Sequence, residues 1–294
     1  MTTVTIREVG PRDGLQSEPP LPVEARVALI EALVSAGIRH VEAAAFVSPQ
    51  TAPSMAGAAK VIAALERRAG VWYWALVPNV RGAERALEAE VDAITVTVSA
   101  SQVYSHNNVH MSVDESVAEA ERIGALVHHL LPLDAMIFCA FGSPYEGDTA
   151  PASVVRLGER LLDGGASSVT LADTTGMATP RRISELLNAT GNGVGLHLHE
   201  TRGTGLLNAY AALEAGVTRF DTSIGGLGGS PFADGAAGNV GTEDLVHLLD
   251  DLGVETGVDL ELLLEVSQLF ADAVGHPMPS RVAAAGPRWR LNEA

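Results

Sequence analysis

The chain has 294 residues, of which 47% are hydrophobic and 19% are charged. A chain of this length and composition is typical of a globular protein, and a barrel of this size folds as one domain. The formal net charge of −17 opposes binding to nucleic acid and to an anionic membrane surface. The N-terminus is strand-like rather than a secretion signal, and no run reaches about 18 apolar residues. We therefore expect a cytoplasmic protein.

Short β-rich runs alternate with helical patterns from one end of the chain to the other. This alternation predicts repeated βα units around a parallel sheet. The predicted strands cover residues 4–9, 38–46, 71–77, 93–99, 134–141, 168–173, 193–199 and 219–224. The predicted helices include residues 23–36, 113–129, 152–163, 184–189, 205–215 and 243–252.

Eight such units predict an α/β fold of the (β/α)8, or TIM, barrel type. An open doubly wound sheet usually has fewer strands and a phosphate-binding turn near its start. Residues 260–273 predict one extra C-terminal helix, and residues 277–294 show no periodicity. We expect one barrel domain over residues 1–276, which includes that helix, followed by a tail over residues 277–294.

Two residue counts restrict the chemistry. Lys60 is the only lysine and lies in a predicted helical stretch, whereas a Schiff-base aldolase needs a lysine in its pocket. Cys139 is the only cysteine and lies in an apolar run, which favours a buried structural thiol and rules out an intramolecular disulfide. Aldol-type chemistry in this chain would therefore use a metal.

Polar residues occur at the ends of predicted strands, where the catalytic groups of such barrels gather. His197 and His199 are two residues apart on a predicted strand, so both imidazoles point to the same face and can bind one ion. Asp13 follows the first strand and would add an oxygen ligand. These donors suit Mg²⁺ or Mn²⁺, with Zn²⁺ as the less favoured ion.

Two further carboxylates and one glycine-rich segment have two interpretations each. Glu42 lies among apolar residues, so it either takes part in the chemistry or forms a salt bridge that only orders Arg12. Asp173 ends a predicted strand and is either a site residue or a helix cap. Residues 225–231 form either a hinged lid or a permissive loop.

The chain resembles the 3-hydroxy-3-methylglutaryl-CoA (HMG-CoA) lyases from residue 5 to residue 264. The resemblance rests on specific segments: EVGPRDGLQ at 8–16, FVSP at 46–49, SAS at 99–101, PYEG at 144–147, HLH at 197–199, and GLGG at 226–229 with GN at 238–239. Related metal-dependent Claisen synthases share the early RDG and the HxH. The FVSP and GLGG segments favour the lyases, and therefore cleavage over condensation.

The resemblance implies a role for each matching residue. Arg12 would stabilise the enolate of the departing acetyl-CoA, Glu42 and Asp173 would transfer protons or orient the substrate, and Gln16 would support the metal-bound groups. The metal ligands would be Asp13, His197, His199 and Asn239. The implied reaction is a retro-Claisen cleavage of an acyl-CoA to acetyl-CoA and a keto acid, catalysed by a homo-oligomer.

One position departs from the family pattern. The family has a catalytic cysteine after GLGG, and this chain has Ser230, which is a much weaker acid than a thiol. Two alternatives to HMG-CoA cleavage follow from this change. The protein could be a lyase or aldolase for a different hydroxyacyl-CoA or hydroxy acid, or a catalytically weak homologue that binds acyl-CoA.

Overall fold

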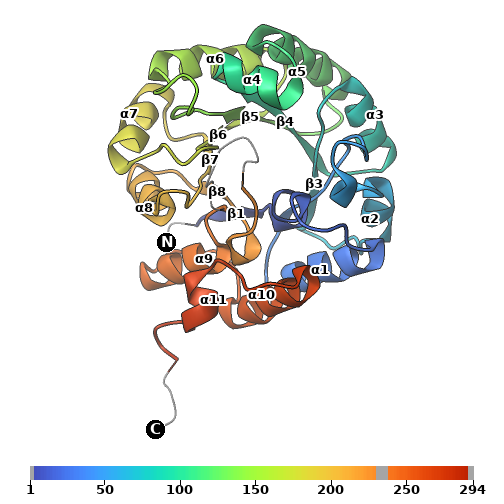
Figure 1. Cartoon of the computed structure of the whole chain (residues 1–294), viewed down its shortest axis with the longest axis vertical. Coiled ribbons are helices and arrows are strands. Elements are labelled where there is room, and N and C mark those ends of the chain that lie inside the picture. The colour runs from blue at the N-terminus through green and yellow to red at the C-terminus, as the bar shows by residue number, and fades with distance from the viewer. Residues whose placement is uncertain (1–2, 230–237, 291–294) are drawn as a thin grey trace.

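The computed structural model describes residues 3–229 and 238–290, which contain a closed barrel of eight parallel strands (Figure 1). Neighbouring strands pair in chain order, and the eighth pairs with the first to close the ring. This arrangement confirms the predicted barrel. The strands are β1 (Thr5–Glu8), β2 (His40–Ala45), β3 (Trp72–Leu76), β4 (Ala93–Ser99), β5 (Leu133–Phe138), β6 (Ser168–Ala172), β7 (Gly195–His197) and β8 (Arg219–Thr222).

Helices form an outer ring around the strands (Figure 1). They are α1 (Val23–Ser35), α2 (Ala58–Ala64), α3 (Val80–Glu88), α4 (Gln102–Val109), α5 (Val113–Val127), α6 (Pro151–Asp163), α7 (Pro180–Thr190), α8 (Gly205–Glu214), α9 (Thr242–Asp251), α10 (Leu260–Val274) and α11 (Arg281–Ala285). The extra C-terminal helix is present as α10.

The short helix α11 lies in the segment that the sequence predicted to be aperiodic. Asp244 holds this segment against α9, because its carboxylate accepts hydrogen bonds from Ser280 Oγ at 3.0 Å and from the Val282 backbone N–H at 2.8 Å. A helix of five residues is too short to produce a detectable hydrophobic period. The helix α11 is stabilised by contact with Asp244, a residue distant in the sequence, which explains why the sequence pattern did not predict the helix.

The strands are buried on both faces because side chains alternate between the barrel interior and the ring of helices. On β5, Met136 and Phe138 face the interior, where both line a cavity at the barrel mouth. Ile137, between them, is fully buried on the other face, and its Cδ1 lies close to Gly158 of α6. The interior therefore receives every second side chain of each strand.

Two buried glutamates anchor the glycine-rich segment that follows β8. Glu8 Oε1 accepts hydrogen bonds from the backbone N–H groups of Gly10 at 2.7 Å and Ile224 at 2.8 Å. The Glu243 carboxylate accepts from the Gly225 N–H at 2.9 and 3.0 Å. Burial raises the pKa of Glu8 to about 7 and that of Glu243 to about 8. The segment is thus tied to β1 on one side and to α9 on the other.

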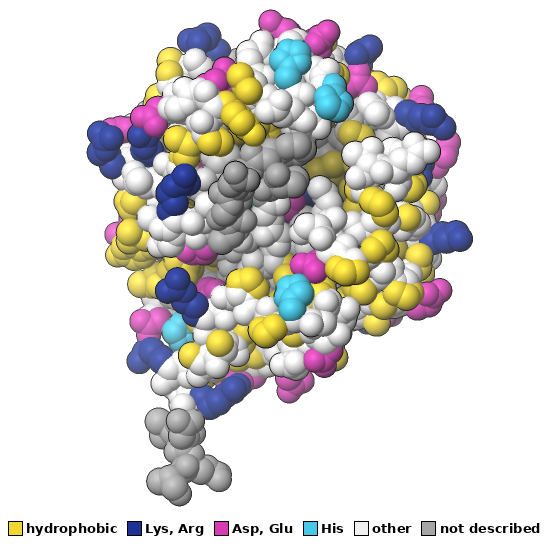
Figure 2. Space-filling model, in the orientation of Figure 1, with side chains coloured by type: hydrophobic (Ala, Val, Ile, Leu, Met, Phe, Trp, Pro, Cys, Tyr) yellow, Lys and Arg dark blue, Asp and Glu magenta, His cyan; other side chains and the backbone are white. Residues whose placement is uncertain are grey.

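Basic side chains (Lys and Arg) on the face shown in Figure 2 are spread singly or in small groups over the outer helices. Acidic side chains lie among them on the same face. Within residues 3–229 and 238–290, no helix is both long and apolar enough to cross a membrane.

We expect Glu243→Gln to reduce the loss of stability at alkaline pH. The folded protein ionises Glu243 only near pH 8, whereas the unfolded chain ionises it near its ordinary value of 4.5, so stability falls as pH rises through this window. Between pH 6 and pH 9 the linked loss is about 2–3 kcal/mol. Urea unfolding at both pH values measures it, with Glu159→Gln on the exposed face of α6 as the control. Equal losses in the wild type and in Glu243→Gln would contradict the assignment.

Candidate metal centre

The loop after β1 presents Arg12 and Asp13 together. It forms a single π-helical turn over Gly10–Gly14, in which the Val9 carbonyl accepts hydrogen bonds from the backbone N–H groups of Arg12 and Asp13 at 3.1 and 2.6 Å. Arg12 Nη1 donates to Asp13 Oδ1 at 2.5 Å. Although burial opposes ionisation, the charge of Arg12 keeps the pKa of Asp13 below its ordinary value.

The two histidines lie where β7 ends. The sequence predicted a strand that reaches residue 199, but β7 ends at His197. Beyond it the chain pairs in antiparallel fashion with the segment after β8, so that His199 lies opposite Asn239. The Leu198 carbonyl accepts a hydrogen bond from the Val240 N–H at 3.0 Å. This pairing brings Asn239 beside the two imidazoles, whose Nε2 atoms are 3.1 Å apart.

These side chains fit a divalent metal ion. Asp13, His197 and His199 each offer one ligand atom, and the three atoms lie within 4.8 Å of one another. Burial, together with the charge of His197, lowers the pKa of His199 to about 3, so its ring is neutral and can ligate at neutral pH. Asn239 Nδ2 donates to Asp13 Oδ2 at 2.8 Å, while its buried Oδ1 has no hydrogen-bond partner among the described residues. Facing imidazole nitrogens and a bare amide oxygen are groups that a cation satisfies.

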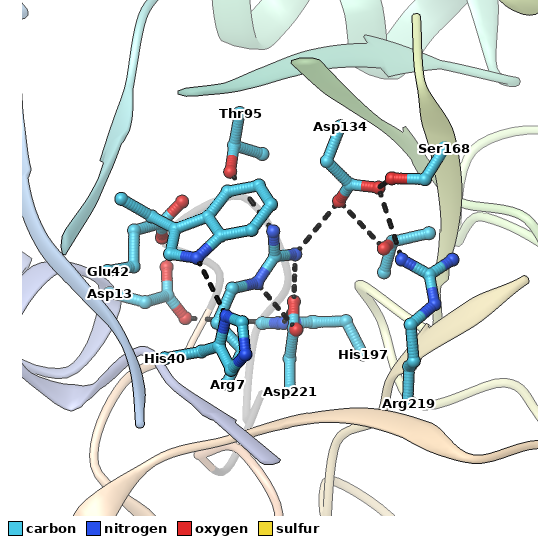
Figure 3. A network of polar contacts seen from close by, with 12 residues as sticks. Arg7, Asp13, His40, Glu42, Thr95, Asp134, Ser168, His197, Arg219 and Asp221 are labelled. Atoms are coloured by element: carbon cyan, nitrogen blue, oxygen red, sulfur yellow. Dashed lines mark hydrogen bonds and ion pairs between the residues drawn. The ribbon is translucent and has the colours of Figure 1, made fainter. Parts of the chain in front are cut away.

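Asp221 lies behind His197 in the barrel interior (Figure 3). Its Oδ2 is 3.3 Å from His197 Nδ1, which is the contact that orients a ligating histidine and directs its other nitrogen toward a metal. Although burial disfavours the ionised form, the charge of Arg7 keeps the pKa of Asp221 below its ordinary value. The Asp221 carboxylate therefore remains available to accept from the ring.

Arg7 of β1 connects Asp221 to the rest of the interior network (Figure 3). Its Nε and Nη2 donate to the two Asp221 oxygens at 2.8 Å each, and Nη2 also donates to Asp134 at 3.0 Å. The guanidinium lies over the Trp74 ring, 5.0 Å from its centroid. The sequence analysis missed Arg7, Asp134 and Asp221. Asp134 carried the same signal as Glu42, namely a charged residue within a strand that is otherwise apolar. Arg7 and Asp221 lie in strands that contain other charged residues.

Glu42 of β2 forms an ion pair with Arg12. Arg12 Nε donates to Glu42 Oε2, and both side chains are nearly inaccessible to solvent. The salt bridge considered for Glu42 is therefore present. The second oxygen, Oε1, is buried and accepts no hydrogen bond from the part of the chain that the structure describes. Arg12 thus lies between two carboxylates at the barrel mouth.

Asp173 follows β6 and lies beside the histidine strand. Its Oδ1 accepts hydrogen bonds from the backbone N–H groups of Met177 at 2.7 Å and Ala178 at 2.9 Å, and burial raises the pKa of Asp173 to about 7. Thr179 is the N-cap of α7, so the helix-cap interpretation of Asp173 was wrong. Its buried Oδ2 has no partner within residues 3–229 and 238–290.

Two predicted site residues are less well defined by the structure. Gln16 is exposed, and its backbone carbonyl accepts a hydrogen bond from Ser54 Oγ at 2.7 Å; its supporting role stays a prediction. Ser230 lies outside the described residues, as does the last position of the predicted lid, residue 231, whereas residues 225–229 are described. Gly228 is described: its φ is +101°, and a Cβ there would lie 2.6 Å from Asn239 Nδ2, so this position requires glycine.

The single lysine and the single cysteine lie away from this chemistry. Lys60 is exposed on α2 in the outer ring, which excludes a lysine Schiff base in the barrel mouth. Cys139 is fully buried after β5, and burial raises the pKa of its thiol to about 12. The predicted structural role for this cysteine agrees with its burial.

Comparison with known proteins places this chain in one protein family. A family model described as HMGL-like matches residues 3–270. Hydroxymethylglutaryl-CoA lyase from Bacillus subtilis is 40% identical over 285 residues, 95% of each chain. A Pseudomonas aeruginosa protein named 3-hydroxy-3-isohexenylglutaryl-CoA/hydroxymethylglutaryl-CoA lyase is 39% identical, with 96% of each chain covered.

Comparison with solved structures gives the same family assignment. An HMG-CoA lyase from Acinetobacter baumannii, in complex with coenzyme A and 3-methylmalate, has a TM-score of 0.94 and 38% identity, with 99% of this chain and 98% of that chain covered. This likeness extends over the whole barrel, including the β1, β7 and β8 ends that carry the candidate site. The chain therefore belongs to the HMGL-like family and is a carbon–carbon lyase.

Proposed function

We propose that the protein cleaves HMG-CoA to acetyl-CoA and acetoacetate, with Mg²⁺ or Mn²⁺ held by Asp13, His197, His199 and Asn239. The observation that carries this proposal is the convergence of an aspartate and two histidines within 4.8 Å at the barrel mouth. Two imidazole nitrogens and two oxygens suit these ions, and imidazole also tolerates zinc. The names of the relatives support the substrate.

In the proposed reaction the C3 hydroxyl loses its proton and the C2–C3 bond breaks. The electron pair of that bond passes to the enolate of acetyl-CoA, while C3 becomes the ketone of acetoacetate. Return of a proton to C2 completes the products. When bound, a divalent ion supplies Lewis-acid polarisation of the substrate hydroxyl, which lowers the pKa of that group.

Arg12 is the proposed partner of the enolate oxygen. Its guanidinium is buried beside Asp13 and Glu42, so it is held in place before charge develops on the substrate. Glu42 and Asp173 are the proposed groups for proton transfer or substrate orientation. Each carries a buried carboxylate oxygen that is free to contact substrate, as far as the described residues show.

We expect purified protein with Mg²⁺ or Mn²⁺ to release acetyl-CoA from HMG-CoA, and His199→Ala to lose most of this activity. Loss of one ligand should lower kcat by roughly a thousandfold, equivalent to about 4 kcal/mol, and should weaken metal binding measured by calorimetry. His276→Ala, on the exposed surface, is the control. Absence of acetyl-CoA from the wild type would overturn the substrate, and a His199→Ala protein with normal metal affinity would overturn the centre.

Asp221→Asn tests the group behind His197. The amide still occupies the same space but lacks the negative charge that makes the ring a better ligand, so we expect metal affinity to fall by about 10–100-fold. Asp134→Asn is the matched control, since it removes a buried charge that also pairs with Arg7 but lies apart from the histidines. Equal loss of metal affinity in both variants would contradict a specific role for Asp221.

Ser230→Cys tests the proton donor. A thiol is a stronger acid than a hydroxyl, so if Ser230 returns the proton to the enolate, kcat should rise by about tenfold or more in this variant. Ser230→Ala supplies the lower reference. Equal kcat values for the wild type, Ser230→Cys and Ser230→Ala would show that another residue is the acid.

A further inference from the structure

The cavity at the barrel mouth has two chemically different sides. Its volume is about 60 Å³, which is small beside the roughly 300–1,000 Å³ typical of small-molecule sites. One side carries the polar groups of the candidate metal centre. Another part of the lining consists of three large side chains, which we call the apolar wall: Tyr104, Met136 and Phe138. Asn108 and Thr174 also line the cavity.

The apolar wall lies across the barrel from Asp13, which follows β1, and two strands away from His197 of β7. Met136 and Phe138 belong to β5, which lies four strands away from β1 in the closed ring. Met136 is fully buried. Tyr104 of α4 is only 2% exposed and meets Phe138 edge to face, with ring centroids 6.3 Å apart at 87°. These side chains therefore line the same cavity as the candidate metal ligands.

A hydrogen bond between Ser101 and Glu146, which we call the brace, helps to keep Tyr104 in this position. Ser101 is the N-cap of α4, and its Oγ accepts a hydrogen bond from the Tyr104 N–H at 3.1 Å. The same hydroxyl donates to Glu146 Oε2, and the Val103 N–H contacts that oxygen at 3.3 Å. The SAS and PYEG segments of the family pattern thus hold α4 over the barrel mouth. Movement of Tyr104 away from the cavity would break these hydrogen bonds.

The substituents on C3 of the proposed substrate suit different parts of the cavity lining. The hydroxyl belongs on the metal side, and the thioester arm must leave through the open mouth because coenzyme A is long. A carboxylate would be costly against buried apolar side chains. The uncharged methyl group on C3 is the substituent that suits Tyr104, Met136 and Phe138 best.

We propose that the apolar wall, with Phe138 as its main member, limits the uncharged substituent on the hydroxyl-bearing carbon to about the size of a methyl group. This inference rests on the proposed function. One methylene more or less in an apolar pocket changes kcat/KM by about 10–200-fold. The longer isohexenyl branch, which the name of the Pseudomonas relative mentions, is therefore excluded by Phe138.

The test compares HMG-CoA with 3-hydroxy-3-isohexenylglutaryl-CoA in the wild type and in Phe138→Ala. We expect the wild type to favour the methyl substrate by at least about tenfold in kcat/KM. Phe138→Ala should shift this ratio toward the longer substrate by about 10–100-fold, with metal affinity unchanged. Ile137→Ala is the matched control, because it truncates the same strand on the face toward α6. Phe138→Leu provides a milder change if the alanine variant does not fold.

Calorimetric dissociation constants for the two compounds, measured on the same variants, separate the two proposals. A wild type that cleaves neither compound contradicts the proposed function, while the ratio of the two dissociation constants still decides whether the apolar wall selects size. A wild type that accepts both compounds equally overturns the inference. An equal shift in Phe138→Ala and Ile137→Ala, or no shift in either, overturns it as well.

Discussion

The ion pair between Arg7 and Asp221 determines how the barrel closes and where the site forms. The two residues are direct register partners of β1 and β8, and both side chains lie inside the barrel (Figure 3). A slip of one residue would turn either side chain toward the helices, and removal of one partner from a buried pair costs about 3–5 kcal/mol. The correct register of the closing strands is thereby favoured.

The same register sets the geometry of the candidate centre. Asp13 follows β1 and Asn239 follows β8, so the positions of both depend on how these strands pair. Asp221 extends the effect to β7 through its contact with His197. Strand pairing, interior charge balance and ligand placement are thus connected, because Arg7, Asp134 and Asp221 are each paired with a residue on a different strand.

Much of the fold and part of the site follow from the sequence alone. The eight strands were predictable because each is a short β-rich run followed by a helical pattern, and strand order in such a barrel follows chain order. The pair of histidines was predictable from their spacing of two. These features are local, and local patterns are what a single sequence displays.

The remaining features depend on contacts between distant residues. Leu198, just after β7, and Val240, in the segment after β8, pair in antiparallel fashion. No local sequence pattern predicts this pairing. Arg7 and Asp221 are separated by 214 positions, so no local pattern indicates that they form a pair. The helix α11 depends on Asp244 in the same way. Charged residues on different strands of a barrel can therefore be partners of one another even when they are far apart in the sequence.

Cys139 has a consequence for how the enzyme tolerates oxidants. It is the only thiol of the chain, and burial keeps it protonated with a pKa of about 12. Thiolates, rather than thiols, react with peroxides and disulfides. With serine at position 230 and no second cysteine, the chain has no low-pKa sulfur for glutathione or peroxide to modify. A disulfide within the chain or a reactive thiolate is therefore not available as a redox switch in this lyase.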